Sequence, residues 1–327
     1  KIKNFLEPLT NRHQQDFSQP QAAELYRLLL AEGLSDARPT DRLIIVPDGI
    51  LGTLPFEILA LPGTASIKEA GYLGDRYAVS YYQSASLLAL KRALPGGQPT
   101  RSLFALGNPD FGTTAGNQQS FRGLSVVPKQ YGQPVLFPPL PETEAEVRRI
   151  AALLGTAIQP PDILLGSQAT ESMLRQSPLG GYRYLHFATH ASLPGMIQEV
   201  NEPFILLSQR DKRSGSDGFL TLSEVLDLKL NAELVMLSAC VTGVGKEVEG
   251  EGVANFARAF QSAGAGSVVV SLWEVASEPA VEYVTLFYGY LKQGKPHALA
   301  LKLAREQMRK KYPNPFYWGV FVLHGEG

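Results

Sequence analysis

The sequence contains a single cysteine, Cys240, among its 327 residues. One cysteine excludes an internal disulfide and is too few for a thiolate zinc site. Disulfides persist in oxidising compartments, so a chain without one fits a reducing compartment best, and we expect the cytoplasm. The bland interpretation of a lone cysteine is a buried, inert side chain, and only its sequence context indicates otherwise.

The chain also lacks a charge excess of either sign and a long apolar run. Its 30 Lys and Arg residues nearly balance 31 Asp and Glu residues, which gives a formal net charge of −1. No strong field therefore draws the chain to nucleic acid or to an anionic membrane. No uninterrupted apolar segment approaches the ~18 residues of a membrane span. We expect neither a nucleic-acid partner nor a membrane partner.

The start of the chain gives no targeting signal. Residues 1–16 are polar and mixed in charge, unlike a secretory signal. The chain begins with Lys1 rather than methionine, so we expect a fragment of a longer protein. The missing part is a candidate for a targeting or recognition module.

Short apolar runs alternate with amphipathic patterns, which favours an α/β fold with a mostly parallel sheet. Residues 111–141 are rich in Gly, Gln and Pro without a sustained period, and they predict a long loop or linker. We therefore predict two α/β subdomains, residues 1–141 and 142–327. The predicted strands are residues 43–46, 78–82, 102–106, 182–188, 204–207, 233–238, 266–272 and 318–323. Helices are expected at about residues 86–94, 142–154, 169–176, 222–228, 253–263, 279–291 and 296–311.

Two predicted strands run into small polar turns that carry reactive side chains, His190 after one and Cys240 after the other. Ligands bind at the carboxyl edge of an open parallel sheet, so the two side chains emerge side by side if the strands are neighbours. The thiolate is the nucleophilic form of cysteine, and a nearby imidazole can take the thiol proton and later protonate a leaving amine. His190 precedes Cys240 by 50 residues, the spacing found in caspases.

Motifs along nearly the whole chain extend this similarity. They are Val46-Pro47-Asp48-Gly49 with Leu54-Pro55-Phe56-Glu57, Leu185-His186-Phe187-Ala188-Thr189-His190, Leu237-Ser238-Ala239-Cys240-Val241-Thr242-Gly243, Gly250-Glu251-Gly252, Ser271-Leu272-Trp273-Glu274-Val275 and Phe316-Tyr317-Trp318-Gly319-Val320-Phe321-Val322. In this order they resemble CHAT domains, caspase-like peptidase domains that are related to separase and caspases and often follow tetratricopeptide repeats.

The resemblance implies an active site and a fold. It makes Cys240 the nucleophile and His190 the catalytic histidine of a cysteine endopeptidase, and it requires no metal or other cofactor. It implies a caspase-like α/β/α sandwich preceded by a pseudo-caspase subdomain. By analogy, the backbone amides of Ala191 and Cys240 are the expected oxyanion donors. The expected partners are a protein substrate and a regulatory repeat module or activator protein.

Two departures from the family pattern bear on function. Ala191 stands where the family has glycine, and Ala276-Ser277 stand where it often has an Asp-Asp pair. Glu274 and Glu278 flank that gap, and they predict an acidic pocket that prefers Arg or Lys before the scissile bond. The departures favour the alternative function, a catalytically silent scaffold or signalling module that binds partners. A third, remote interpretation is an acyl transferase that uses the same dyad.

Two further features have open interpretations. His186 lies an even number of residues from His190, so both side chains are expected on one side of the strand. We expect a structural role for His186, with a hydrogen bond beside the site as the alternative, and no third ligand that would indicate zinc. Residues 209–218 are charged and rich in Gly and Ser, which predicts a mobile surface loop. Because this loop offers Arg and Lys between the catalytic strands, self-processing there is the alternative.

Overall fold

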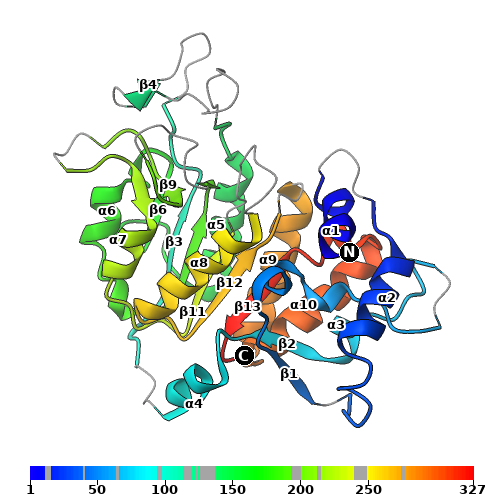
Figure 1. Ribbon diagram of the computed structural model, residues 1–327. Helices are drawn as coiled ribbons and strands as arrows, with labels where there is room; N and C mark the ends of the chain where they lie inside the picture. Colours follow the sequence, from blue (N-terminus) through cyan, green and yellow to red (C-terminus); the bar gives the residue numbers. More distant parts are fainter. Residues whose placement is uncertain are drawn as a thin grey trace. The chain divides into compact units, whose positions relative to one another are not determined.

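The computed structural model describes most of the chain in two compact units. Unit 1 comprises Lys1–Leu94 and Leu272–Gly327, and unit 2 comprises Pro95–Ser271. Figure 1 follows both along the sequence, with unit 2 running from cyan to yellow. The described residues are 1–11, 16–39, 41–63, 66–93, 98–112, 120–121, 124–125, 137–192, 200–211, 215–238, 249–273 and 277–327.

Unit 1 is formed by the first and the last segments of the chain. Its parallel strands lie in the order β1 (Arg42–Ile45), β2 (Ala78–Tyr81) and β13 (Phe321–Gly325). The rings of Tyr72 and Trp318 pack edge to face in its core, with centroids 4.8 Å apart. Its helices are α1 (Ile2–Thr10), α2 (Gln19–Leu29), α3 (Leu73–Arg76), α4 (Ala85–Ala93), α9 (Ser277–Lys292) and α10 (His297–Lys311), with 3-10 turns at Gly49–Thr53, Phe56–Ile58 and Pro315–Tyr317.

Unit 2 holds a parallel sheet in the strand order β12-β11-β7-β3-β6. These strands are β3 (Arg101–Gly107), β6 (Ile163–Leu165), β7 (Tyr182–Ala188), β11 (Leu234–Leu237) and β12 (Ser267–Ser271). Its helices are α5 (Pro141–Leu154), α6 (Glu171–Gln176), α7 (Leu222–Asp227) and α8 (Glu249–Ser262), with 3-10 turns at Gly166–Gln168 and Leu179–Gly181. The central position of β7 buries nearly all of its side chains, as expected for an inner strand of a covered parallel sheet.

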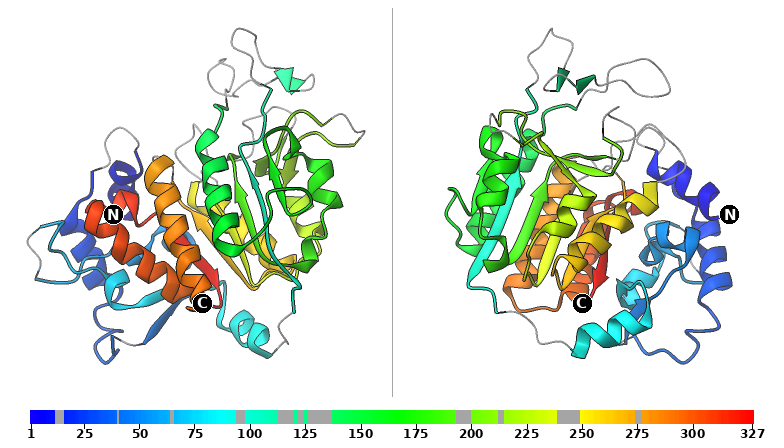
Figure 2. Two further views of the ribbon diagram at one scale, coloured as in Figure 1. Left: turned by 180° about the vertical axis from the view of Figure 1, so that it is seen from behind. Right: turned by 60° about the vertical axis from the view of Figure 1, so that its left-hand side comes forward.

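Helices cover both faces of the unit 2 sheet. Successive residues of a strand point to opposite faces. On β7, His186 contacts Glu146 of α5, whereas the next residue, Phe187, packs on Phe260 of α8 with ring centroids 5.3 Å apart. Helices α5 and α8 therefore lie on opposite faces, as the two views in Figure 2 show, and the layers are α/β/α.

A small antiparallel sheet follows the carboxyl end of β7. It has the order β10-β9-β8, from β10 (Phe219–Thr221), β9 (Phe204–Leu206) and β8 (Ala191–Ser192). Strand β8 begins directly after His190, so the backbone of His190 is held between two sheets. A separate hairpin pairs β4 (Ser120–Phe121) with β5 (Leu124–Ser125).

The predicted α/β class with mostly parallel strands is confirmed. In unit 2, apolar runs predicted β3, β7, β9, β11 and β12, whereas its other strands were not predicted. The compact units do not follow the predicted division between residues 1–141 and 142–327, because β3 pairs with β7 and β13 pairs with β2. The assignment of a pseudo-caspase and a catalytic subdomain to those ranges stays a prediction. The sequence indicated no helix at α1 or α2. The predicted linker at residues 111–141 lies mostly outside the described residues.

Candidate active site

His190 lies just beyond the carboxyl end of β7, in a nearly closed environment. Its residue is only 4% exposed. The imidazole packs against two phenylalanine rings, with its centroid 5.3 Å from that of Phe111 and 5.4 Å from that of Phe137. Its Nε2 atom lies 2.9 Å from the carbonyl oxygen of Pro138. The two phenylalanine rings and the Pro138 carbonyl thus restrict the orientation of the imidazole.

The contact with Pro138 fixes the tautomer of the imidazole. A carbonyl oxygen only accepts hydrogen bonds, so Nε2 of His190 must donate and must carry a hydrogen. In the neutral ring the lone pair then belongs to Nδ1, which becomes the nitrogen that can accept a proton. A backbone carbonyl has no signature in the sequence, and the sequence did not predict this partner.

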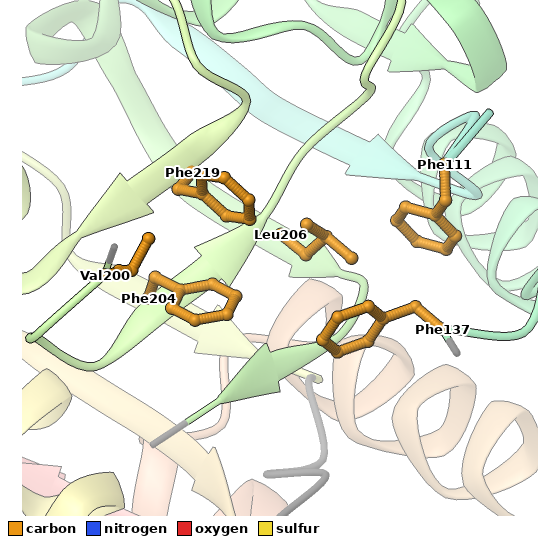
Figure 3. Packing of buried hydrophobic residues seen from close by; sticks show 6 residues of the cluster. All are labelled: Phe111, Phe137, Val200, Phe204, Leu206 and Phe219. Carbon is orange, nitrogen blue, oxygen red and sulfur yellow. The ribbon is translucent and has the colours of Figure 1, made fainter. Parts of the chain in front are cut away.

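Apolar side chains surround His190 on the side of the small sheet. The Phe137 cluster consists of Phe111, Phe137, Val200, Phe204, Leu206 and Phe219 (Figure 3). Within it, Phe137 meets Phe204 with ring centroids 6.5 Å apart, and Phe204 meets Phe219 at 4.9 Å. Because this cluster keeps water from one side of the imidazole, the hydrogen bond to Pro138 is stronger than it would be in water.

The backbone around His190 is ordered by β9. The Leu206 N–H donates to the His190 carbonyl at 2.8 Å, and the Thr189 hydroxyl donates to the Leu206 carbonyl at 2.7 Å. Backbone groups of successive strand residues point in alternate directions, so the N–H of Ala191 points away from β9. Among the described non-glycine residues only Asn108 has a positive φ, so the alanine at 191 requires no glycine-like backbone. Its methyl group is fully buried.

The strand that leads to Cys240 is the immediate neighbour of β7. Strands β11 and β7 are parallel, with Met236 opposite His186 and Leu237 opposite Phe187. Their carboxyl ends therefore lie at the same edge of the sheet, as the sequence required for a dyad. Cys240 itself lies in residues 239–248, outside the described residues, so its role and its separation from His190 stay predictions.

His186 forms a buried pair with a carboxylate. Its Nε2 lies 2.8 Å from Oε1 of Glu146 on α5, and the two side chains are 0% and 2% exposed. The expected structural role and the alternative hydrogen bond beside the site are both compatible with this pair. Glu146 was not singled out in the sequence. The available signal was its position on the inward face of α5, which it shares with Thr143, Val147 and Ile150.

The predicted substrate pocket is not assembled by the described residues. Glu274 lies outside them, and Glu278 is exposed near the start of α9 in unit 1. The pocket therefore stays a prediction. The described residues contain no group of three or more His, Cys, Asp or Glu side chains that could hold a metal ion. In the same part of the chain, no helix is long and apolar enough to cross a membrane.

Buried carboxylates anchor both described ends of the 209–218 segment. Oδ2 of Asp211 accepts hydrogen bonds from the Ser172 N–H at 2.9 Å and from the Ser216 hydroxyl at 2.8 Å. Oε2 of Glu171, which is 1% exposed, accepts from the N–H groups of Asp217 and Gly218. Lys212 and Arg213 of this loop lie outside the described residues, so self-processing stays a hypothesis.

Comparisons with known proteins agree with this architecture. A family model described as the CHAT domain matches residues 19–326. Tetratricopeptide repeat protein 28 of Homo sapiens is 30% identical over 351 residues, which cover 96% of this chain and 13% of that protein. The chain therefore spans a small part of the curated relative that it matches.

Solved structures share the fold at low sequence identity. The Arg specific cysteine proteinase gingipain R superposes with a TM-score of 0.55 and 13% identity, over 100% of this chain and 74% of that chain. The separase–securin complex of Saccharomyces cerevisiae gives a TM-score of 0.49 and 13% identity, over 88% of this chain and 15% of that chain. The likeness to gingipain R confirms the predicted caspase-like α/β fold.

Proposed function

Because the chain belongs to the CHAT domain family, we propose that it is a cysteine endopeptidase in which His190 activates the thiol of Cys240. One observation carries the proposal. The imidazole at the carboxyl end of β7 donates through Nε2 to the Pro138 carbonyl, beside the strand that leads to Cys240. Because Nε2 donates to Pro138, Nδ1 is the nitrogen that can act as the base. The family pattern assigns Cys240 as the thiol from which it takes a proton.

The proposed reaction proceeds in two half-reactions. Nδ1 of His190 takes the proton of the Cys240 thiol, and the thiolate attacks the peptide carbonyl carbon to form a tetrahedral oxyanion. Collapse of this oxyanion breaks the C–N bond, and the leaving amine takes the proton from Nδ1. Water then attacks the thioester, again with Nδ1 as base, and the release of the acid restores the thiol.

Backbone amides are the proposed oxyanion donors. The N–H of Ala191 points away from β9, so it takes no part in the ladder with that strand, which is compatible with the proposed role. The second proposed donor is the backbone N–H of Cys240, the residue that also supplies the nucleophilic thiol. Alanine at position 191 is compatible with this role because its backbone needs no positive φ.

Cleavage of a fluorogenic peptide panel tests the proposal and the pocket together. The peptides differ only in the residue before the scissile bond, and wild type is compared with Cys240→Ala. We expect cleavage by wild type alone, with Arg and Lys preferred because Glu274 and Glu278 supply negative charge. Charge-assisted hydrogen bonds of about 1.5–3 kcal/mol correspond to a preference of about 10- to 150-fold. A clear preference for Asp or for an apolar residue would refute the acidic pocket but leave the peptidase intact.

The burial of His190 supports a second candidate, a module that binds partners or is held inactive until one binds. A base that is 4% exposed would need a rearrangement before a bulky peptide reached it. We propose that an attached repeat module or an activator protein regulates the site, since a relative carries tetratricopeptide repeats in its name. Full labelling of Cys240 without turnover of any peptide would favour this candidate.

A further inference from the structure

The two histidines of the β7 region contact the same short part of the chain. His186 pairs through Nε2 with Glu146 on the second turn of α5. His190 pairs through Nε2 with Pro138, which precedes the start of α5. Pro138, whose carbonyl orients the proposed base, therefore lies eight positions before Glu146, whose carboxylate contacts His186 on β7.

Several contacts hold the chain between Pro138 and Glu146. Leu140 caps α5, and its carbonyl accepts from both the N–H of Thr143 at 3.0 Å and the Thr143 hydroxyl at 2.7 Å. Pro141 begins the helix and fixes its own φ. Phe137 is held in turn by packing against His190 and Phe204. A displacement of α5 along the sheet would therefore carry the Pro138 carbonyl with it.

Helix α5 has a second attachment at β3, the strand next to β7. The N–H of Asn108 donates to the Thr143 hydroxyl at 2.8 Å. Gly107 lies so close that an added Cβ would come within 2.8 Å of the Thr143 carbonyl oxygen. Hydrogen bonds from Arg148 and Asn108 lower the pKa of Glu144, so the exposed side of the helix is also tied to this strand end. These contacts fix the first turn, whereas Glu146 fixes the helix to β7 itself.

We propose that Glu146 is a positioning residue for His190, acting through His186 and α5, and this inference rests on the proposed function. Apolar packing of Val147 and Ile150 buries α5 but is tolerant of small shifts along the sheet, whereas a buried hydrogen bond has one favourable distance and direction. The Glu146–His186 pair therefore sets the register of α5 on β7, in addition to the Thr143–Asn108 contact that holds the helix at β3. That register keeps the Pro138 carbonyl at hydrogen-bond distance from Nε2 of His190.

Glu146→Leu tests this inference, because it removes the accepting oxygen and keeps a side chain of similar size. Two quantities are measured per folded molecule: steady-state cleavage of the best peptide, and alkylation of Cys240 by iodoacetamide, which needs no substrate pocket. We expect kcat and the alkylation rate to fall together by about 10- to 100-fold, the effect of misplacing a catalytic group by about 1 Å. KM is expected to change by less than about 2-fold, because the peptide site is not altered.

Two matched variants separate positioning from a general effect. Glu142→Leu removes a carboxylate one turn earlier on the same helix and is expected to leave kcat and alkylation unchanged. Glu146→Gln retains an accepting oxygen for Nε2 of His186 and is expected to recover most of the lost rate. If Glu146→Leu fails to fold, Glu146→Asp takes its place, because its shorter side chain stretches the contact while keeping the charge.

The outcomes are distinct. A folded Glu146→Leu (or Glu146→Asp) protein with wild-type kcat and wild-type alkylation would overturn the inference, as would an equal loss in Glu142→Leu. A change in KM alone would also overturn it, because it would place Glu146 in substrate binding. Absence of alkylation in folded wild type would instead contradict the proposed function, so the two failures are distinguishable.

Discussion

Replacement of His190 by alanine is expected to lower peptide cleavage by about 10³-fold or more while Cys240 stays in place. The imidazole is the proposed acceptor of the thiol proton and the donor to the leaving amine, so both half-reactions lose their proton carrier. Nε2 of His190 is oriented by the Pro138 carbonyl at 2.9 Å, and the sequence offers no other histidine at this strand end that could take over Nδ1's role. Steady-state cleavage of the preferred peptide gives the measurement.

This variant also removes a ring that packs against Phe111 and Phe137, so folding must be checked alongside activity. His190→Gln fills more of the site and still donates to Pro138, yet it cannot act as a base near neutral pH. His297→Ala, at the start of α10, removes an imidazole that belongs to unit 1 and serves as the control. Comparable activity in wild type and folded His190→Gln would contradict the assignment of the base.

Replacement of Glu57 by leucine is expected to destabilise the protein by about 3–5 kcal/mol, because it leaves a buried arginine without its partner. Glu57 lies in the Leu54-Pro55-Phe56-Glu57 motif of unit 1 and is 1% exposed. Its Oε2 accepts from the Tyr81 hydroxyl at 2.5 Å, and its Oε1 lies 3.4 Å from Nη2 of Arg305. Arg305 is 2% exposed and, as a guanidinium, stays charged at any working pH.

The complementary change, Arg305→Met, is expected to cost less, about 1–3 kcal/mol. Burial raises the pKa of Glu57 above its ordinary value, while the Arg305 charge and the Tyr81 hydrogen bond oppose that shift. Without Arg305 the opposing charge is lost, and Glu57 can become neutral by taking up a proton. Arg305→Met is thus expected to cost less stability than Glu57→Leu, because the remaining glutamate can become neutral whereas a remaining arginine cannot.

Urea unfolding of both single variants and of the double variant measures these effects as a cycle. The double variant replaces the pair by apolar side chains and is expected to recover much of the stability that Glu57→Leu loses. Losses that simply add would indicate that Glu57 and Arg305 do not interact, despite their burial in one cluster.

The parts of the site that follow from local pattern were predictable from the sequence. The apolar run before His190 and the run before Cys240 became β7 and β11, and the parallel pairing of covered strands followed from their composition. Helix α5 was predicted from the acidic residues in its first turn and the glycine at its end, where Gly155 adopts φ +70°.

What the sequence did not indicate are contacts between residues that are distant along the chain. The Pro138 carbonyl is a backbone group that any residue would carry, and it meets His190 52 residues later. Glu146 and His186 are 40 residues apart and pair only because α5 covers that face of β7. Strand β13 pairs with β2 although most of the sequence separates them, which no periodicity reveals. Helix α1 was missed because polar residues and Pro8 obscure its buried face, Phe5 and Leu9.

Alkylation of the single cysteine at about pH 6 tests the central claim most directly, because every adduct must lie on Cys240. A free thiol with a pKa of about 8.5 is almost entirely protonated at that pH and reacts slowly. The account predicts rapid, stoichiometric modification of folded wild type, seen as one added mass, and a rate in His190→Ala that falls to that of a free thiol or below. Equal rates in the two proteins, or modification only after unfolding in urea, would contradict the claim that His190 activates Cys240.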